Sequence, residues 1–63
     1  MNLLTPREKE IAQAVARGYT NLEIATRLHL AEGTVKRNLS RVFVKMRVRN
    51  RTELTLRLVK AGR

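Results

Sequence analysis

Between positions 36 and 41, four side chains carry hydrogen-bonding groups that suit the edges of DNA bases. They are Lys36, Arg37, Ser40 and Arg41. Arginine and lysine are the usual partners of guanine in the major groove, and a serine hydroxyl can pair with several bases. On an α-helix these positions share one side, because residues three or four apart are neighbours there. We therefore interpret the four side chains as contacts to base edges.

The remaining reactive side chains do not suggest a catalytic or metal site. His29 is the only histidine and the chain has no cysteine, so neither a metal-ligand set nor a disulfide is expected. Ser40 has no identifiable base and orienting group for a nucleophilic triad. The five carboxylates fall mostly at capping or surface positions, and no acid–base pair stands out. We predict no enzymatic activity and no cofactor.

Positive charge is concentrated in the second half of the chain. The formal net charge is +9. Residues 1–35 contain four basic and four acidic residues, whereas residues 36–63 contain ten basic residues and one acidic residue, Glu53. Solubility is served by mixed charge, so a surface of one sign predicts a polyanionic partner. No apolar run is long enough to span a membrane, and we expect a cytoplasmic protein without membrane contact.

Capping signals divide the chain into helices. Residues 5–8, 20–23 and 50–53 each place a Thr or Asn three positions before a Glu, which is the capping-box pattern. Gly18 is expected to end the first helix in a left-handed conformation. Between the second and third boxes, apolar residues spaced by four, three and four positions predict a helix with one buried stripe; they are Val35, Leu39, Val42 and Met46. We predict one all-α domain over residues 1–63, with four helices at about 6–17, 21–28, 32–46 and 51–61.

The second and third predicted helices form a helix-turn-helix. Only three residues, 29–31, separate them, and in this motif the second helix enters the major groove of duplex DNA. Phosphate contacts are expected from backbone amides at a helix start and from hydroxyl, amide or ammonium groups beside it. The candidates are Thr20, Asn21, Thr34, Asn38 and Lys45.

Four stretches resemble the LuxR/GerE family of DNA-binding domains, in the same order and with similar spacing. They are Leu4–Glu8, Gly18–Ala25, Gly33–Lys36 and Val48–Glu53, and the resemblance covers about residues 3–60. It implies a four-helix domain of bacterial transcription regulators whose third helix reads DNA and whose fourth can pair two subunits. Such domains usually end a longer protein, behind a phosphoryl-accepting receiver or an autoinducer-binding domain.

Four positions depart from the family pattern. Ala31 stands where a Ser or Thr cap is usual, and a lost cap costs roughly 1 kcal/mol. Gly33 replaces a longer, often basic residue in the first turn of the same helix. Asn38 stands where His is frequent, and Leu22 stands where a polar residue is usual. An exposed Leu22 is ordinary for a protein surface, and a contact with RNA polymerase is the alternative.

Two other functions remain open at this point. Residues 33–36 and 39–41 also resemble region 4 of sigma factors, which reads promoter DNA with a similar motif, although residues 48–53 match LuxR/GerE better. A basic amphipathic module for proteins or membranes belongs to a different class. It would call for bulky aromatic residues on the apolar face, and the chain has only Tyr19 and Phe43.

The last predicted helix offers a pairing surface. Leu54, Leu58 and Ala61 share one face and should pack on the core. Leu56 and Val59 point elsewhere, and we interpret them as dimer contacts, although they could also face a regulatory domain or simply be exposed. Because this patch is small, the homodimer should be weak alone and stronger on DNA.

Overall fold

The structure is a computed structural model that describes residues 3–61 as four helices joined by short turns. The helices are α1 (Pro6–Ala16), α2 (Asn21–Leu28), α3 (Glu32–Met46) and α4 (Arg51–Ala61). No strand occurs among these residues, so the predicted all-α class is confirmed. The first helix ends one residue earlier than expected, because Arg17 is its C-cap. None of the four helices has the length and apolar character needed to cross a membrane.

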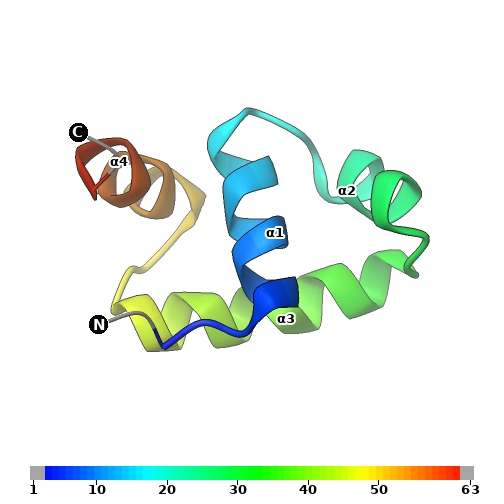
Figure 1. Ribbon diagram of the computed structural model, residues 1–63, viewed down its shortest axis with the longest axis horizontal. Helices are drawn as coiled ribbons and strands as arrows, with labels where there is room; N and C mark the ends of the chain where they lie inside the picture. Colours follow the sequence, from blue (N-terminus) through cyan, green and yellow to red (C-terminus); the bar gives the residue numbers. More distant parts are fainter. Residues whose placement is uncertain (1–2, 62–63) are drawn as a thin grey trace.

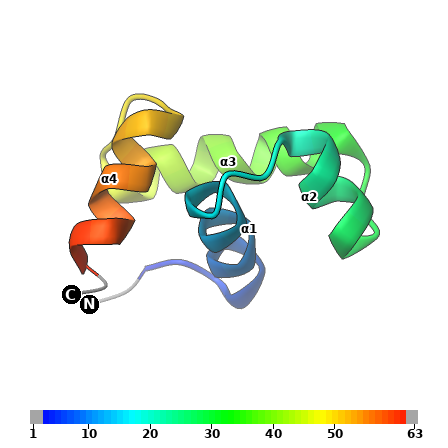
Figure 2. The same ribbon diagram turned by 90° about the horizontal axis from the view of Figure 1, so that it is seen from above.

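The helix α1 lies at the centre of the domain and packs against each of the other three (Figure 1). The longest helix, α3, runs along one side of the domain. Its N-terminal end lies near α2 and its C-terminal end near α4, and the view from above shows the same order (Figure 2). The helix-turn-helix pair is therefore held from behind by α1, which leaves the opposite side of α3 open.

The apolar stripes predicted from the sequence form the core. Val35 and Val42 are fully buried, Leu39 is nearly so, and Met46 is half-buried against them. In α4, Leu54 is fully buried and Leu58 packs on the core as expected. The side chain of Ala61 lies outside the described residues. Residues from all four helices thus meet in one cluster, which fixes the orientation of the exposed side of α3.

Two of the three predicted capping boxes form as expected. Glu8 N donates to Thr5 Oγ1 at 3.2 Å and Thr5 N donates to Glu8 Oε1 at 3.0 Å. The same reciprocal pair joins Thr20 and Glu23, at 3.1 and 2.8 Å. In the third box, at residues 50–53, one of the two predicted hydrogen bonds is wrong. Glu53 N donates to Asn50 Oδ1, but the Glu53 carboxylate accepts from the amide of Arg49, one residue earlier, rather than from Asn50.

Three residues within the described chain adopt a positive φ. Gly18 has φ of 93° just after α1, in agreement with the predicted stop. His29 and Arg47 have φ of 58° and 56° at the ends of α2 and α3. The left-handed conformation costs a residue with a Cβ more than it costs glycine. Two of the three helix ends are therefore closed in this conformation by residues that carry a Cβ.

Replacing Arg47 with glycine should stabilise the domain. Glycine relieves the left-handed strain at Arg47, and part of the gain is offset by its greater freedom in the unfolded chain, which leaves about 0.5–1 kcal/mol. For a domain of this size the change corresponds to a Tm about 2–8 °C higher in thermal unfolding. The matched control is Arg49→Gly, which removes the same side chain outside the left-handed region and should not stabilise. An equal gain in both variants would show that charge, and not backbone strain, is responsible.

Candidate nucleic-acid interface

The turn between α2 and α3 sets the geometry of the helix-turn-helix. His29 closes α2 in the left-handed conformation, and Leu30 N donates to Ala25 O at 2.8 Å. Leu28 and Leu30 are half-buried against the core, which ties both sides of the turn to the packed interior. Ala31 caps α3 without any side-chain hydrogen bond, as the missing hydroxyl predicts. The angle between the helices is therefore fixed by apolar packing and the turn backbone.

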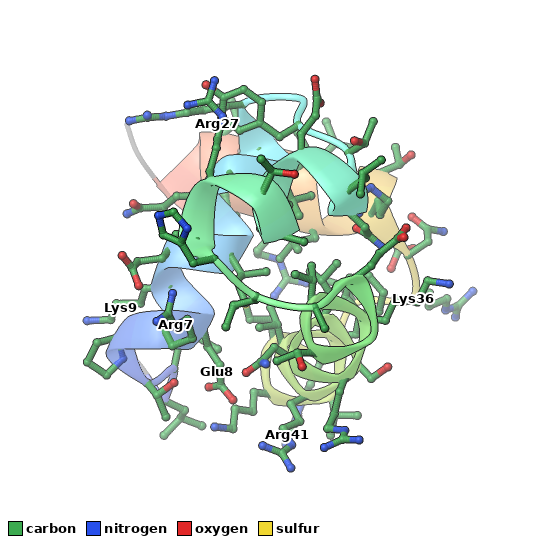
Figure 3. All side chains as sticks on the ribbon, turned by 90° about the vertical axis from the view of Figure 1, so that its right-hand side faces the viewer. Arg7, Glu8, Lys9, Arg27, Lys36 and Arg41 are labelled. Atoms are coloured by element: carbon green, nitrogen blue, oxygen red, sulfur yellow. The ribbon has the colours of Figure 1, made fainter. Side chains whose placement is uncertain are left out.

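All four predicted base contacts are exposed on α3. At about 100° per residue, Lys36 and Arg41 mark the edges of this face, and Ser40 and Arg37 lie between them. Figure 3 shows Lys36 and Arg41 pointing away from the body of the domain in different directions. The face is free of carboxylates after the first turn, where Glu32 lies. It can therefore present cationic donors across the width of a groove.

The hydroxyl proton of Ser40 is used in a hydrogen bond within α3. The Ser40 O–H donates to Lys36 O, one turn earlier, at 3.2 Å. A serine hydroxyl has one proton and two lone pairs. With the proton directed to the helix backbone, Ser40 offers acceptors to the exterior, which suit the amino groups of adenine or cytosine. The cations beside it offer donors, so the face combines both kinds of partner.

The start of α2 carries two of the predicted phosphate contacts. Thr20 Oγ1 accepts from Glu23 N, which leaves its proton free to be donated. Asn21 Oδ1 accepts from the guanidinium of Arg51, so the Asn21 amide nitrogen is left to donate outward. Both residues therefore present donors beside the positive end of the helix dipole, an arrangement that suits an anion.

Arg51 is a contributor that the sequence analysis missed. Its guanidinium joins the start of α4 to the start of α2, donating to Asn21 Oδ1 and, at 2.6 Å, to Tyr19 O. A shallow hollow between α2, α3 and α4 is lined by Asn21, Lys36, Leu39, Ser40, Phe43 and Arg51. A cation in the first turn of a helix opposes the helix dipole. That unfavourable placement is the signal that could have marked Arg51 as a residue with another task.

Thr34 and Asn38 are less open than Thr20 and resemble Asn21 in exposure. Both are half-buried, and Asn38 Nδ2 donates to Thr34 O at 2.8 Å. The bond consumes one of the two amide protons of Asn38 and leaves the second. Their phosphate contacts stay predictions.

The structure gives Lys45 a partner within the protein. Its Nζ lies 2.7 Å from Glu8 Oε1, and only 3% of the Glu8 side chain is exposed. The hydrogen bond from Lys45, followed by the backbone bond from Thr5, holds the pKa of the Glu8 carboxyl below its ordinary value against the opposing effect of burial. Lys45 therefore joins α3 to the start of α1. Its additional contact with a phosphate stays a prediction.

The Glu8 ion pair predicts a dependence of stability on acid. A carboxyl whose pKa is lowered on folding stabilises the fold fully above the pKa of the unfolded chain, and that contribution is lost as the pH falls through the lower folded-state value. Glu8→Gln should therefore be less stable than the unchanged protein at neutral pH, and the gap should close in acid. Denaturant unfolding at neutral and acidic pH measures this gap. Glu10→Gln, an exposed carboxylate of the same helix, is the control, and a Glu8→Gln gap that stays constant with pH would contradict the assignment.

Comparison with known proteins agrees with this geometry. Residues 2–58 match the model of the family described as bacterial regulatory proteins, luxR family. The chain is 46% identical over 55 residues to the transcriptional regulatory protein ComA of Bacillus subtilis, which covers 87% of this chain and 26% of the relative. It is 37% identical over 62 residues to the transcriptional regulatory protein DegU of Brevibacillus brevis, covering 98% and 26%. It is 41% identical over 54 residues to the response regulator protein VraR of Staphylococcus aureus, covering 86% and 26%.

The chain spans about a quarter of the length of these curated relatives. The matched part of this chain contains all of α1, α2 and α3 and most of α4. The chain belongs to the luxR family of bacterial regulatory proteins and is a DNA-binding helix-turn-helix domain of transcription regulators.

Proposed function

We propose that this domain binds specific sequences of duplex DNA with α3 in the major groove. The observation that carries the proposal is the exposed face of α3, where Lys36, Arg37, Ser40 and Arg41 follow one another around the helix with no carboxylate among them. An α-helix fits the major groove by size, and the side chains on this face offer both donors and acceptors to base edges. Lys36, Arg37, Ser40 and Arg41 are the proposed base contacts.

The phosphate backbone would be bound at the edges of this face. Thr20 and Asn21 present donors at the start of α2, on the side of α3 that Lys36 occupies. We assign these two residues to one DNA strand, with Arg51 as the group that orients Asn21. We also propose phosphate contacts for Thr34, Asn38 and Lys45, of which the Lys45 ammonium is shared with the Glu8 carboxylate.

Selection of bound sites from random duplex DNA tests the proposal. The domain should enrich one short motif, because each good base contact discriminates by about 1–3 kcal/mol. Repeating the selection with Lys36→Ala should relax the motif at one position and leave the others unchanged. Recovery of unrelated sequences with the unchanged protein would contradict sequence-specific binding.

We also propose that α4 pairs two copies on DNA. Leu54 is fully buried, and Leu56 lies about 200° further round the helix, so it points away from the core. Leu56 and Val59 are 56% and 50% exposed, and because they lie three positions apart on the helix they form one small apolar patch. Such a patch is too small for a stable dimer in solution, but it can add to binding when DNA holds two copies together. Leu22 of α2 is exposed. The alternative interpretation of this residue, a contact with RNA polymerase, stays a prediction.

Leu56→Glu should abolish cooperative binding while preserving single-site binding. Two subunits would occupy half-sites about 10 base pairs apart, one turn of the duplex. Burying a glutamate between them is unfavourable, so binding to a two-half-site duplex should lose its cooperativity, and affinity for a single half-site should stay within about twofold. Leu3→Glu makes the same change at a leucine of similar exposure outside α4 and is the matched control. Unchanged cooperativity in Leu56→Glu would exclude this interface.

A further inference from the structure

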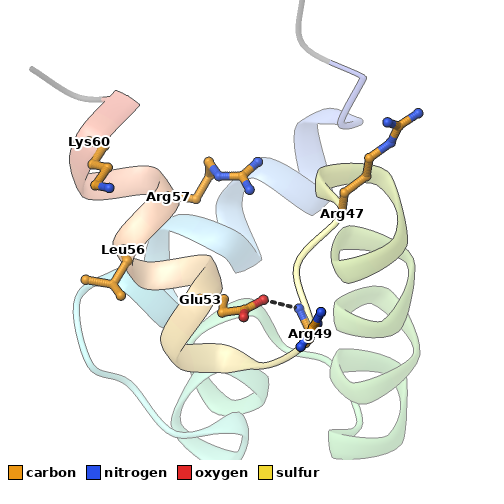
Figure 4. Close-up of a pocket in the computed structure, with 6 residues that line it drawn as sticks. All are labelled: Arg47, Arg49, Glu53, Leu56, Arg57 and Lys60. Carbon is orange, nitrogen blue, oxygen red and sulfur yellow. Dashed lines mark hydrogen bonds between the residues drawn. The ribbon is translucent and has the colours of Figure 1, made fainter.

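A second positively charged surface lies away from the base-reading part of α3. It is a shallow cleft between the C-terminal end of α3, the following loop and α4 (Figure 4). We call it the cationic cleft, and it is lined by Arg47, Arg49, Glu53, Leu56, Arg57 and Lys60. Arg41, the proposed base contact nearest to it in the sequence, lies six positions before Arg47, which is about 9 Å along a helix axis. None of the four proposed base contacts lines the cleft.

The charges of the cleft are poorly balanced within the protein. Glu53 is its one carboxylate, and Glu53 Oε1 accepts from the backbone amide of Arg49 at 2.7 Å, as Figure 4 shows. Arg57 Nη1 donates to Met46 O at 3.0 Å, a neutral acceptor at the end of α3. In the described part of the chain the ion pairs lie elsewhere, between α1 residues and between α1 and α3. The four cations of the cleft thus lack an anionic partner.

An apolar side chain lies among these cations. Leu56 is 56% exposed and borders the cleft between Glu53 and Lys60, which are its neighbours on the outer side of α4. A phosphodiester backbone could pair with the cations, but it has no apolar group to cover a leucine. A protein segment that combines carboxylates with an apolar side chain can satisfy both.

A second copy of this chain fits the cleft poorly. A two-fold contact centred on the cleft, rather than on the apolar pair Leu56 and Val59, would set the cations of one copy against those of the other, and like charges in contact oppose association. Leu56 also belongs to the pairing surface proposed for α4. An acidic segment seated in the cleft would therefore cover part of that surface and compete with pairing.

We propose that the cationic cleft docks an acidic amphipathic segment of another protein, with carboxylates on Arg47, Arg49 and Lys60 and an apolar side chain on Leu56. This proposal does not depend on DNA binding by α3. Such a partner would lower cooperativity on paired half-sites without blocking the base-reading face.

The probe is a helical peptide of glutamate and leucine, about 15–20 residues long, with leucines three and four positions apart on one face. A peptide of equal charge with alanine in place of leucine is the companion probe. Titration of the isotope-labelled domain, followed by NMR amide shifts, reports both the site and the affinity. The expected shifts lie at residues 47–60, and the leucine peptide should bind more tightly than the alanine peptide.

Two variants test the role of the cationic side chains in peptide binding, and a third variant serves as the control. Lys60→Glu and Arg47→Gly should each weaken peptide binding, by about tenfold for the charge reversal, whereas Lys9→Glu, an exposed lysine of α1, should stay within about twofold. Because Arg47→Gly should stabilise the fold, unfolding cannot explain a loss in that variant. Shifts centred on residues 36–41, or equal binding of the two peptides, would overturn the proposal. So would an equal loss of peptide and duplex DNA affinity in Lys60→Glu, which would place the cleft in the DNA interface.

Discussion

Affinity for duplex DNA should fall by about 10²–10³-fold when monovalent salt rises from about 50 to about 200 mM. The physical cause is the release of counterions from DNA as cations of the protein replace them. A subunit that makes about 4–6 phosphate contacts gives a slope of log K against log salt near −4 to −5. The surplus of positive charge in residues 36–63 is the source of this dependence.

The structure limits which cations contribute to that slope. Lys45 is paired with Glu8, and Arg51 is directed to Asn21 and Tyr19, so neither charge is wholly available to the DNA. Titration of a labelled duplex at four or more salt concentrations measures the slope, with Lys9→Ala as a control that should leave it unchanged. A slope close to zero would contradict electrostatic binding to the backbone.

Alanine substitution of Lys36 or Arg37 should reduce discrimination between the selected site and a scrambled duplex. A side chain that makes a bidentate base contact contributes about 1–3 kcal/mol to discrimination, which corresponds to a loss of roughly 5–150-fold in the affinity ratio. Both side chains are exposed and have no hydrogen bond that would be lost from the folded domain, so stability should be little affected.

The comparison of two classes of variant makes this test specific. Thr20→Ala removes a cap and a proposed phosphate contact, so it should weaken both duplexes to a similar degree and lower stability by about 0.5–2 kcal/mol. Binding to both duplexes is measured at one salt concentration, under conditions in which the Thr20→Ala variant is fully folded. If Lys36→Ala and Thr20→Ala changed the affinity ratio equally, the proposed orientation of α3 would be wrong.

Local signals in the sequence predicted most of the fold. Thr5 and Thr20 each meet a glutamate three residues later, so the starts of α1 and α2 depend on contacts within one turn. The spacing of Val35, Leu39 and Val42 likewise predicts a buried stripe from helical geometry alone, and all three residues are buried. The same locality explains why the lost cap at Ala31 could be anticipated.

The contacts that position the interface could not be predicted in this way. Lys45 and Glu8 are 37 positions apart, and Arg51 and Asn21 are 30 apart, so their meeting depends on how the helices pack. Lys45 was assigned to phosphate because an ammonium group suits an anion, and nothing local indicates the buried carboxylate beside it. The left-handed conformation of Arg47 could not be predicted either, because an arginine gives no local preference for it.

The position of α3 in the major groove is tested most directly by changing single atoms of the DNA. In the selected half-site, 7-deazaguanine removes the N7 acceptor from the major groove, and inosine removes the amino group of guanine from the minor groove. If α3 lies in the major groove, 7-deazaguanine at the guanine contacted by Lys36 or Arg37 should weaken binding by about tenfold or more, and inosine at the same position should change it less than about twofold. Loss of affinity with inosine and none with 7-deazaguanine would contradict a major-groove position for α3, because the protein would then be reading the minor groove.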